Sequence, residues 1–261
     1  MRIMIKLDNV SLKLPDGRFI FKDINWEVKE NSKWVLFGRN GCGKTRLLEI
    51  ISGYRFPSEG GVWRFGNPPG ADDIRETRKR IGYVSTLLRE KFSTAEPVAD
   101  VVASGLYASV GLYDDVDKDG YEKALNLLSM AALSDRGNDP FGVLSDGERQ
   151  KVIMLRALIN HPDVLILDEA AKGLDLAARE DFLSLIEKIS LSSKTSIIYV
   201  THHVEEIIPV FSDIFMIRNG GCFFSGPVSS GVTSDNLSLL FERRINVERK
   251  AGRYCAFLPE V

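Results

Sequence analysis

The chain has 261 residues, of which 44% are hydrophobic and 27% charged, and its formal net charge at pH 7 is −2. A balance so close to neutral gives no electrostatic basis for binding nucleic acid, so we expect no nucleic-acid partner. Cys42, Cys222 and Cys255 are odd in number and too widely spaced for a zinc site, which disfavours a disulfide framework and favours a reducing compartment.

The segment MRIMIKLDNV lacks the apolar stretch and the cleavage site of a secretory signal. No run of the sequence approaches the roughly 20 apolar residues that a membrane-spanning helix needs. We therefore expect a cytoplasmic chain, so that another chain has to supply the membrane part of any membrane process.

The first half of the chain alternates apolar runs with turn signals, and we expect strands at 5–14, 19–28, 34–38, 60–66 and 80–85. A Pro-Asp-Gly turn separates the first two strands, and a helix that ends at Gly53 follows the third. From about 86 to 145 the sequence changes to helical patterns broken by Gly and Asp, which we interpret as a helical insertion.

The second half alternates buried strands with helices. We expect helices at 145–160 and 177–190, strands at 163–170 and 196–202, a hairpin at 214–226 with Asn-Gly-Gly at its turn, and a further strand in GRYCAFL. Apolar strands in alternation with helices predict an α/β fold with a mostly parallel sheet covered on both faces. We expect one domain over 1–261, with a helical subdomain at about 86–145 and a hairpin and tail at about 214–261.

A glycine-rich segment, GRNGCGKTR, stands between the third strand and the helix after it. Its glycines let backbone N–H groups converge on phosphate oxygens, and the helix adds the positive end of its dipole. We expect Lys44 to reach the outer phosphates and the Thr45 hydroxyl to bind Mg²⁺. The alternative is a plain glycine-rich turn, which the Lys-Thr pair disfavours. The expected phosphate-contacting residues are Gly38, Arg39, Asn40, Gly41, Cys42, Gly43, Lys44, Thr45 and Arg46.

Two acidic residues, Asp168 and Glu169, end the buried strand of VLILDEA. Burying carboxylates costs free energy of desolvation unless cations or hydrogen-bond donors meet them. Asp168 is placed to hold Mg²⁺, and Glu169 is then free to polarise an attacking water. The alternative is a strand that ends in two solvated acids, and the phosphate loop in the same chain favours the catalytic interpretation.

The segment LSDGERQ, which we call the signature segment, has the spacing of a capping box between Ser145 and Glu148. The same helix N-terminus can also face a phosphate, with Ser145 and Gly147 presenting it. That phosphate need not belong to a nucleotide bound by the same chain.

Taken in order, the phosphate loop, LSDGERQ, VLILDEA, GLD and VTH resemble the nucleotide-binding domain of ATP-binding cassette (ABC) proteins. The resemblance covers about 7–241. It implies a P-loop NTPase fold and an ATPase that binds ATP and Mg²⁺. It also implies a dimer, of two copies or with another ABC subunit, that closes on ATP at the cytoplasmic face of the membrane and powers a separate permease.

The family pattern also implies roles for single residues. Ser145, Gly147 and Glu148 contact the ATP of the opposite subunit, Asp175 lies across the interface, and His202 touches the γ-phosphate. Lys44, Glu169 and His202 are the expected catalytic residues. His161 and His203 match no motif, and we expect them to be structural or solvated.

Three positions depart from the family pattern. Ser85 and Thr86 stand where a glutamine usually follows the GYV strand, which predicts loose or rerouted coupling to a permease. Leu14 stands near the position where the family usually has an adenine-stacking aromatic residue. Phe19 is the alternative residue for this role. Asp146 replaces the first glycine of the signature segment, and its charge is tolerable only if the side chain points away from ATP.

The stretch GYVS…EPVADVVASGLYASVGLY and the C-terminal GRY look most like bacterial ATPases of molybdate-type and iron-complex-type importers and their stand-alone relatives. A soluble ABC ATPase without transport, and a nucleotide-gated switch with weak hydrolysis, are the alternatives. A permease partner predicts an apolar groove in the helical insertion, unless its candidate walls pack inside the subdomain instead. These walls are Phe92, Val98, Leu106 and Tyr107.

Overall fold

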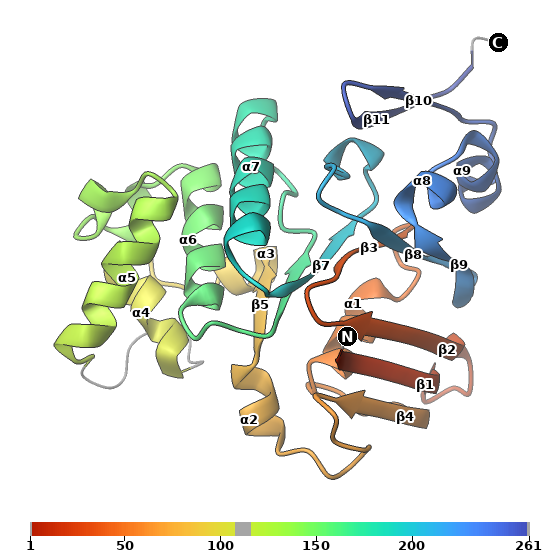
Figure 1. Cartoon of the computed structure of the whole chain (residues 1–261), viewed down its shortest axis with the longest axis horizontal. Helices are drawn as coiled ribbons and strands as arrows, with labels where there is room; N and C mark the ends of the chain where they lie inside the picture. Colours follow the sequence, from red (N-terminus) through yellow and green to blue (C-terminus); the bar gives the residue numbers. More distant parts are fainter. Residues whose placement is uncertain (1, 108–115, 260–261) are drawn as a thin grey trace. The chain divides into compact units, whose positions relative to one another are not determined.

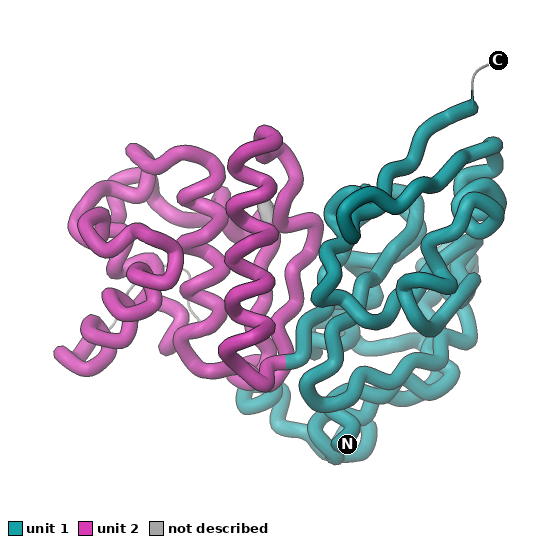
Figure 2. The backbone as a smooth tube through the Cα atoms, turned by 45° about the horizontal axis from the view of Figure 1, so that its top comes forward, with its two compact units in different colours: residues 1–77, 196–261 teal, residues 78–195 magenta. Residues whose placement is uncertain are grey.

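The computed structural model describes residues 2–107 and 116–259, apart from the side chain of Thr86. Two compact units make up the chain, unit 1 from residues 1–77 and 196–261, and unit 2 from residues 78–195 (Figure 2). The helical insertion expected at 86–145 falls in unit 2, and the expected C-terminal hairpin and tail fall in unit 1. Residues 108–115 and 260–261 of these two segments lie outside the described residues.

Unit 1 begins with an antiparallel three-stranded sheet in the order β2 (Phe19–Lys29), β1 (Ile3–Lys13) and β4 (Glu59–Arg64) (Figure 1). The apolar side chains Ile24, Trp26 and Val28 are buried while the residues between them are exposed, which is the period of two of a sheet with one covered face. The two N-terminal strands and their Pro-Asp-Gly turn are therefore confirmed.

A second set of strands in unit 1 runs in the order β7 (Ser196–Thr201), β3 (Lys33–Gly38), β8 (Asp213–Arg218) and β9 (Gly221–Pro227). The first three are parallel, and β9 returns antiparallel through a tight turn. Asn219 and Gly220 at that turn both have positive φ, 50° and 73°, as a two-residue hairpin requires. Helix α1 (Lys44–Ile51) follows β3 and buries its apolar residues.

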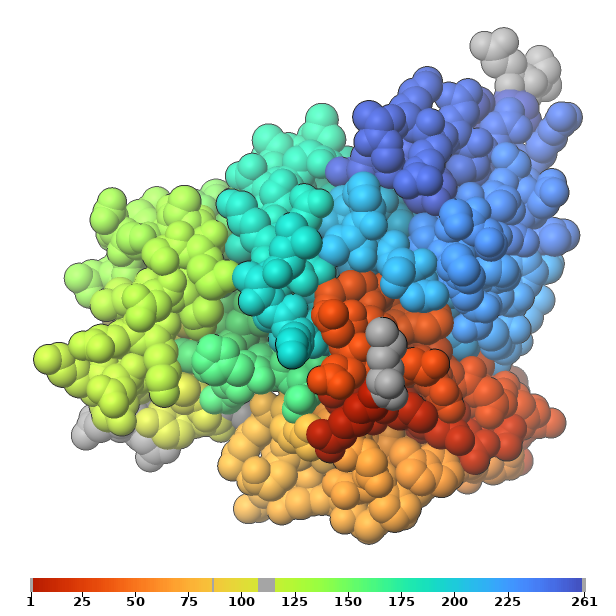
Figure 3. Space-filling model, in the orientation of Figure 1, coloured from red at the N-terminus to blue at the C-terminus, as the bar shows by residue number. Residues whose placement is uncertain are grey.

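The C-terminal part of unit 1 contains the short helices α8 (Val228–Gly231) and α9 (Ser234–Phe241), then a hairpin of β10 (Asn246–Lys250) and β11 (Arg253–Phe257). The β10–β11 hairpin is the darkest blue surface in Figure 3. The strand expected in GRYCAFL is confirmed as β11. Its partner β10 was missed, because NVERK is charged and shows no alternation of apolar and polar residues.

Unit 2 contains the parallel pair β5 (Ile81–Ser85) and β6 (Val164–Asp168). Its helices are α3 (Thr86–Arg89), α4 (Val98–Ala103), α5 (Lys118–Met130), α6 (Asp146–Leu158) and α7 (Leu176–Ser192), and α2 (Ile74–Lys79) stands where unit 1 passes into unit 2. Short 3₁₀ turns are Ser104–Tyr107, Ser134–Arg136 and Phe141–Val143 here, and η4 (Val204–Glu206) in unit 1. Parallel strands with helical connections confirm the α/β class.

The expected apolar groove of the helical insertion is wrong for two of its walls. Phe92 is 6% exposed and Val98 is fully buried, so both belong to the core of unit 2. The ring of Phe92 packs at 6.1 Å from that of Phe141 and at 5.3 Å from the guanidinium of Arg156. Tyr107 is exposed. Within the described ranges, no helix is both long enough and apolar enough to cross a membrane.

Candidate active site

The phosphate loop in unit 1 has the backbone that its glycines predict. β3 ends at Gly38 and α1 begins at Lys44, with Gly41 at φ 80° and Gly43 at φ 100° between them. Residues with a side chain rarely adopt these backbone conformations, so a substitution of either glycine would strain the loop. Gly43 is the N-cap residue of α1 and has no side chain to take up the first N–H groups of the helix. These donors are therefore available to an anion.

The side chain of Lys44, the first residue of α1, reaches back to the start of this loop. Its side chain is almost entirely buried, with the residue 5% exposed, and Nζ donates to the carbonyl oxygens of Gly38 at 2.8 Å and Arg39 at 3.1 Å. The neighbouring Thr45 is exposed, so its hydroxyl is accessible. A cation and a hydroxyl thus stand next to each other at the helix N-terminus, as the motif predicts.

Close packing fixes the loop against β2. A Cβ on Gly43 would come within 2.9 Å of Ile20 Cγ2, so the loop and the start of β2 touch. Leu14 and Phe19, the two candidates for contact with the adenine base, lie near the start of β2. Leu14 is 36% exposed and Phe19 is 39% exposed. The ammonium groups of Lys13 and Lys22 lie 5.1 and 5.6 Å from the centre of the Phe19 ring.

Two arginines expected to contact phosphate make ion pairs at the rim of the loop. Arg39 lies 3.5 Å from Glu242, which Arg218 also approaches at 3.3 Å, and Arg46 lies 2.8 Å from Glu49. The side chains of Arg39 and Glu242 are about half exposed, so their pair adds little stability. The Arg39–Glu242 pair nevertheless connects the phosphate loop to the C-terminal end of α9. The sequence motifs do not predict this contact.

His202 follows directly after β7, at the edge of the unit 1 sheet where the phosphate loop begins. Thr201, the last residue of β7, pairs with Phe37 of β3, one residue before Gly38. The carboxyl ends of parallel strands meet at one edge of a sheet, which is where α/β proteins bind ligands. The ring of the exposed His203 lies 4.1 Å from that of His202, so His203 contacts the motif histidine.

The acidic pair lies at the carboxyl end of β6 in unit 2. Asp168 is 7% exposed, pairs with Ser85 of β5 in the sheet register, and accepts a hydrogen bond of 2.8 Å from the Tyr83 hydroxyl. Glu169 has φ 48°, a left-handed conformation that is uncommon for a residue with a side chain and costs energy. Its carboxylate lies 3.4 Å from Lys172 Nζ.

The capping box of the signature segment is confirmed. Ser145 is the N-cap of α6, its hydroxyl accepts from the Glu148 N–H, and the Glu148 carboxylate accepts from the Ser145 N–H at 2.8 Å. This backbone hydrogen bond is the main reason that the pKa of Glu148 lies below its ordinary value. The Ser145 hydroxyl and the charge of Arg136, 3.3 Å away, act in the same sense against partial desolvation.

The negative charge of Asp146 is balanced by two arginines of unit 2. Its carboxylate lies 3.0 Å from Arg149 and 3.6 Å from Arg89. Sequence reasoning asked only where this side chain points and missed both partners. Arg149 stands three residues along the same helix and could have been found from that spacing, whereas Arg89 comes from a distant segment.

Two other motif residues of unit 2 meet at Ala178 of α7. A Cβ on Gly147 would lie 2.8 Å from the Cβ of Ala178, so a side chain does not fit there. Asp175 is the N-cap of α7 and accepts a hydrogen bond of 2.8 Å from the Ala178 N–H. The N-termini of α6 and α7 are therefore in contact, with Gly147 buried and Asp175 exposed.

The oxygen groups of this chain fit a magnesium ion that is shared with phosphates better than a closed metal cage. In the part of the chain that the structure describes, no group of three His, Cys, Asp or Glu side chains could hold a metal ion. Mg²⁺ usually takes one or two carboxylates plus substrate phosphates. The nearly buried carboxylate of Asp168 and the exposed hydroxyl of Thr45 are ligands of this type.

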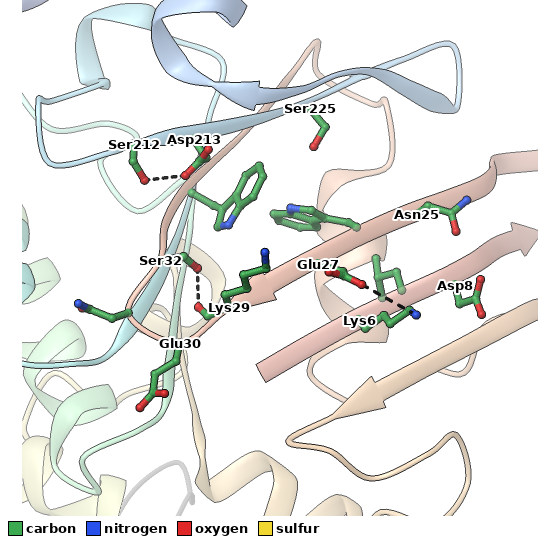
Figure 4. A pocket seen from close by; sticks show the side chains of 14 residues that line it. Lys6, Asp8, Asn25, Glu27, Lys29, Glu30, Ser32, Ser212, Asp213 and Ser225 are labelled. Carbon is green, nitrogen blue, oxygen red and sulfur yellow. Dashed lines mark hydrogen bonds and ion pairs between the residues drawn. The ribbon is translucent and has the colours of Figure 1, made fainter. Parts of the chain in front are cut away.

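A separate hollow of about 720 Å³ lies in unit 1 (Figure 4). The Lys6–Glu27 ion pair, at 3.9 Å, and the hydrogen bond from Ser212 to Asp213, at 2.7 Å, are part of its wall. Its lining comes from β1, β2, the turn before β3, and the strands β3, β8 and β9, whereas the phosphate-loop residues lie elsewhere. We therefore do not assign it to the candidate active site.

Comparison with known proteins agrees with these features. Residues 21–172 match the family model described as ABC transporter. An uncharacterized ABC transporter ATP-binding protein of Bacillus subtilis, YlmA, is 41% identical over 94% of this chain and 93% of its own length. The molybdate import ATP-binding protein MolC of Haemophilus influenzae is 25% identical over 92% and 89%. The dimeric cassette MJ0796, solved in a post-hydrolysis state with ADP and phosphate, aligns with a TM-score of 0.74 at 24% identity over 86% and 99%.

Proposed function

This chain belongs to the ABC transporter family of ATP-binding proteins and hydrolyses ATP to power a transporter, and we propose that it does so as one half of an ATP-closed dimer on a separate membrane permease. The observation that carries the nucleotide site is the ammonium of Lys44, held over a loop whose glycines have φ of 80° and 100°. Phosphate is the ligand that such a loop fits.

In this proposal the phosphate loop binds the outer phosphates through backbone N–H groups and the charge of Lys44. Thr45 and Asp168 would hold Mg²⁺, which would neutralise phosphate charge. The hydrogen bond from the Tyr83 hydroxyl orients one carboxylate oxygen of Asp168. Tyr83 is thus a positioning residue for this ligand.

Glu169 is the residue that polarises the attacking water, and His202 faces the γ-phosphate. A carboxylate can accept the proton of a water within hydrogen-bond distance. Lys172 Nζ lies 3.4 Å from the Glu169 carboxylate and helps to orient it. The left-handed backbone at Glu169 supports a functional role, because such strain is common at active sites and has to be held by its surroundings.

The signature segment serves the ATP of the second subunit. Its helix N-terminus presents donors to phosphate, and the charge of Asp146 is balanced by Arg89 and Arg149, which removes the main objection to an acid at this position. In the same proposal Asp175, which is exposed beside Gly147, contacts the partner across the interface. The second subunit is another copy or a different ABC cassette.

The proposal is tested by nucleotide binding and by partner identification. Lys44→Ala should lose ATP binding, while the control Lys188→Ala, an exposed lysine of α7, should bind like the parent chain. The tagged chain should co-purify from membranes with a multi-span protein, and reconstitution with that protein should stimulate ATP hydrolysis. A chain that hydrolyses ATP but recovers no multi-span protein would contradict the permease partner and leave the ATPase intact.

A further inference from the structure

A buried carboxylate lies just after the motif histidine, in η4. Glu206 is 4% exposed, and its Oε2 accepts hydrogen bonds from the Tyr199 hydroxyl at 2.9 Å and the Thr201 hydroxyl at 2.5 Å. Both hydroxyls belong to buried residues of β7. A buried carboxylate is tolerated only where donors satisfy it, and here two donors on one strand do so. Neither the family motif nor the proposed chemistry uses this acid.

The carboxylate sets the direction of the hydrogen bonds around His202. The Thr201 hydroxyl donates its proton to Glu206 Oε2 in a hydrogen bond. The Thr201 oxygen then has lone pairs for the backbone N–H of His203, which lies 3.0 Å away. The backbone N–H of Glu206 in turn donates to the carbonyl oxygen of His203 at 3.3 Å. These bonds close a ring that fixes the backbone on both sides of His202.

The C-terminal hairpin supports the same turn. β11 packs on η4, and Nε of Arg253 donates to the carbonyl oxygen of Glu205 at 3.1 Å, a bond that its Nη2 shares. Tyr254 beside it is buried. The Glu206 carboxylate and the Arg253 guanidinium therefore both bind the turn that follows His202. Residues just beyond the end of a strand are usually more mobile than the strand itself.

We propose that Glu206 is a positioning residue for His202, which it holds through the side chain of Thr201. This inference rests on the proposed role of His202 in ATP hydrolysis. A side chain that reaches a phosphate from a loop needs a fixed backbone, since a displacement of about 1 Å can cost roughly a hundredfold in rate. The ring of hydrogen bonds supplies that constraint without contact between Glu206 and the nucleotide.

The test is steady-state ATP hydrolysis by the full chain. Glu206→Ala should lower kcat by roughly ten- to a hundredfold and leave KM within about twofold, because nucleotide binding by the phosphate loop is untouched. Glu206→Gln should restore most of kcat, since the amide oxygen can accept the same bonds. Adding Glu206→Ala to a His202→Ala chain should cause no further loss, as expected for two residues that act as one unit.

Two hydroxyl deletions separate positioning from general stability. Thr201→Val and Tyr199→Phe each remove one bond to Glu206, but only Thr201 continues to the His203 N–H. Thr201→Val should therefore lower kcat much more than Tyr199→Phe, and it carries the test if Glu206→Ala does not fold. Equal losses in the two variants, or a loss by Glu206→Ala that persists without His202, would overturn the proposal.

The same variants distinguish a failure of the positioning role of Glu206 from a failure of the proposed role of His202. An inactive His202→Ala chain beside Glu206→Ala and Thr201→Val chains with the parent kcat would refute the positioning role alone. A His202→Ala chain with the parent kcat would refute the proposed role of His202 and the positioning role with it.

Discussion

Gly147 of the signature segment gives the sharpest test of the packing in unit 2. In Gly147→Ala the new Cβ would lie 2.8 Å from the Cβ of Ala178, where carbon atoms normally approach to about 3.5–4.0 Å. Neither methyl group can rotate away, so α6 and α7 must separate at their N-termini. Overpacking of this kind costs about 1–3 kcal/mol, whereas the higher helix propensity of alanine returns about 1 kcal/mol. The net loss of unfolding free energy should be about 0–2 kcal/mol.

The clash is best isolated in a double-mutant cycle. Ala178→Gly removes the opposing methyl group at a cost of about 1 kcal/mol in helix propensity. In the double variant Gly147→Ala with Ala178→Gly the clash is absent, so the coupling free energy should be about 1–3 kcal/mol in favour of the pair. Urea unfolding of the four proteins measures it. Additive effects, with a coupling near zero, would refute the contact between the two helices.

The same cycle reports on function through the position of the α6 N-terminus. Gly147→Ala should lower kcat for ATP, and the double variant should recover part of it, because the separation of α6 from α7 displaces the signature segment. A Gly147→Ala chain with the parent kcat, together with a coupling near zero in the cycle, would show that this glycine is required neither for packing nor for the proposed contact with nucleotide.

Three further predictions concern charge, pH and the base. Glu169→Gln should keep ATP binding, lose turnover and elute as a dimer with MgATP in size-exclusion chromatography, whereas Glu187→Gln, an exposed control on α7, should behave like the parent chain. The lowered pKa of Glu148 stabilises the fold fully above its ordinary pKa of about 4.5 and less as the pH falls through the lower folded value, so Glu148→Gln should flatten the acid limb of a stability–pH curve. Leu14→Tyr should lower KM for ATP. The parent chain should hydrolyse GTP with a kcat/KM within roughly tenfold of that for ATP, a gap of about 1.4 kcal/mol in activation free energy. A thousandfold preference for ATP would show that another residue, such as Phe19, contacts the base.

Sequence reasoning succeeded where the signal is local. The turn at Asn219 and Gly220 follows from backbone sterics, the capping box between Ser145 and Glu148 from helix geometry, and the phosphate loop from the positive φ of its glycines. Each depends on residues a few positions apart. The sequence left two alternatives open for the walls of the expected groove, because apolar residues such as Phe92 satisfy a surface and a core pattern equally well and only the packing decides between them.

The partners of the motif acids show why the rest could not be predicted. Asp168 receives its hydrogen bond from Tyr83, which is 85 residues away, and Asp146 meets Arg89 from 57 residues away. The position of an acid can be read from the sequence, but the donors that satisfy it come from whichever segment the fold brings near. A sequence therefore reveals these carboxylates before it reveals what orients them.

This asymmetry also explains why Glu206 escaped the motif analysis. It stands only four residues after His202, yet in the sequence it is one of two adjacent glutamates in a polar turn, and most such residues are solvated. Its burial follows from β7, whose Tyr199 and Thr201 hydroxyls need an acceptor once the strand is covered. The carboxylate accepts from both hydroxyls and therefore orients the Thr201 hydroxyl toward itself. The fixed backbone at His202 is thus a consequence of burying a strand with two hydroxyl groups. The motif of the histidine alone does not predict it.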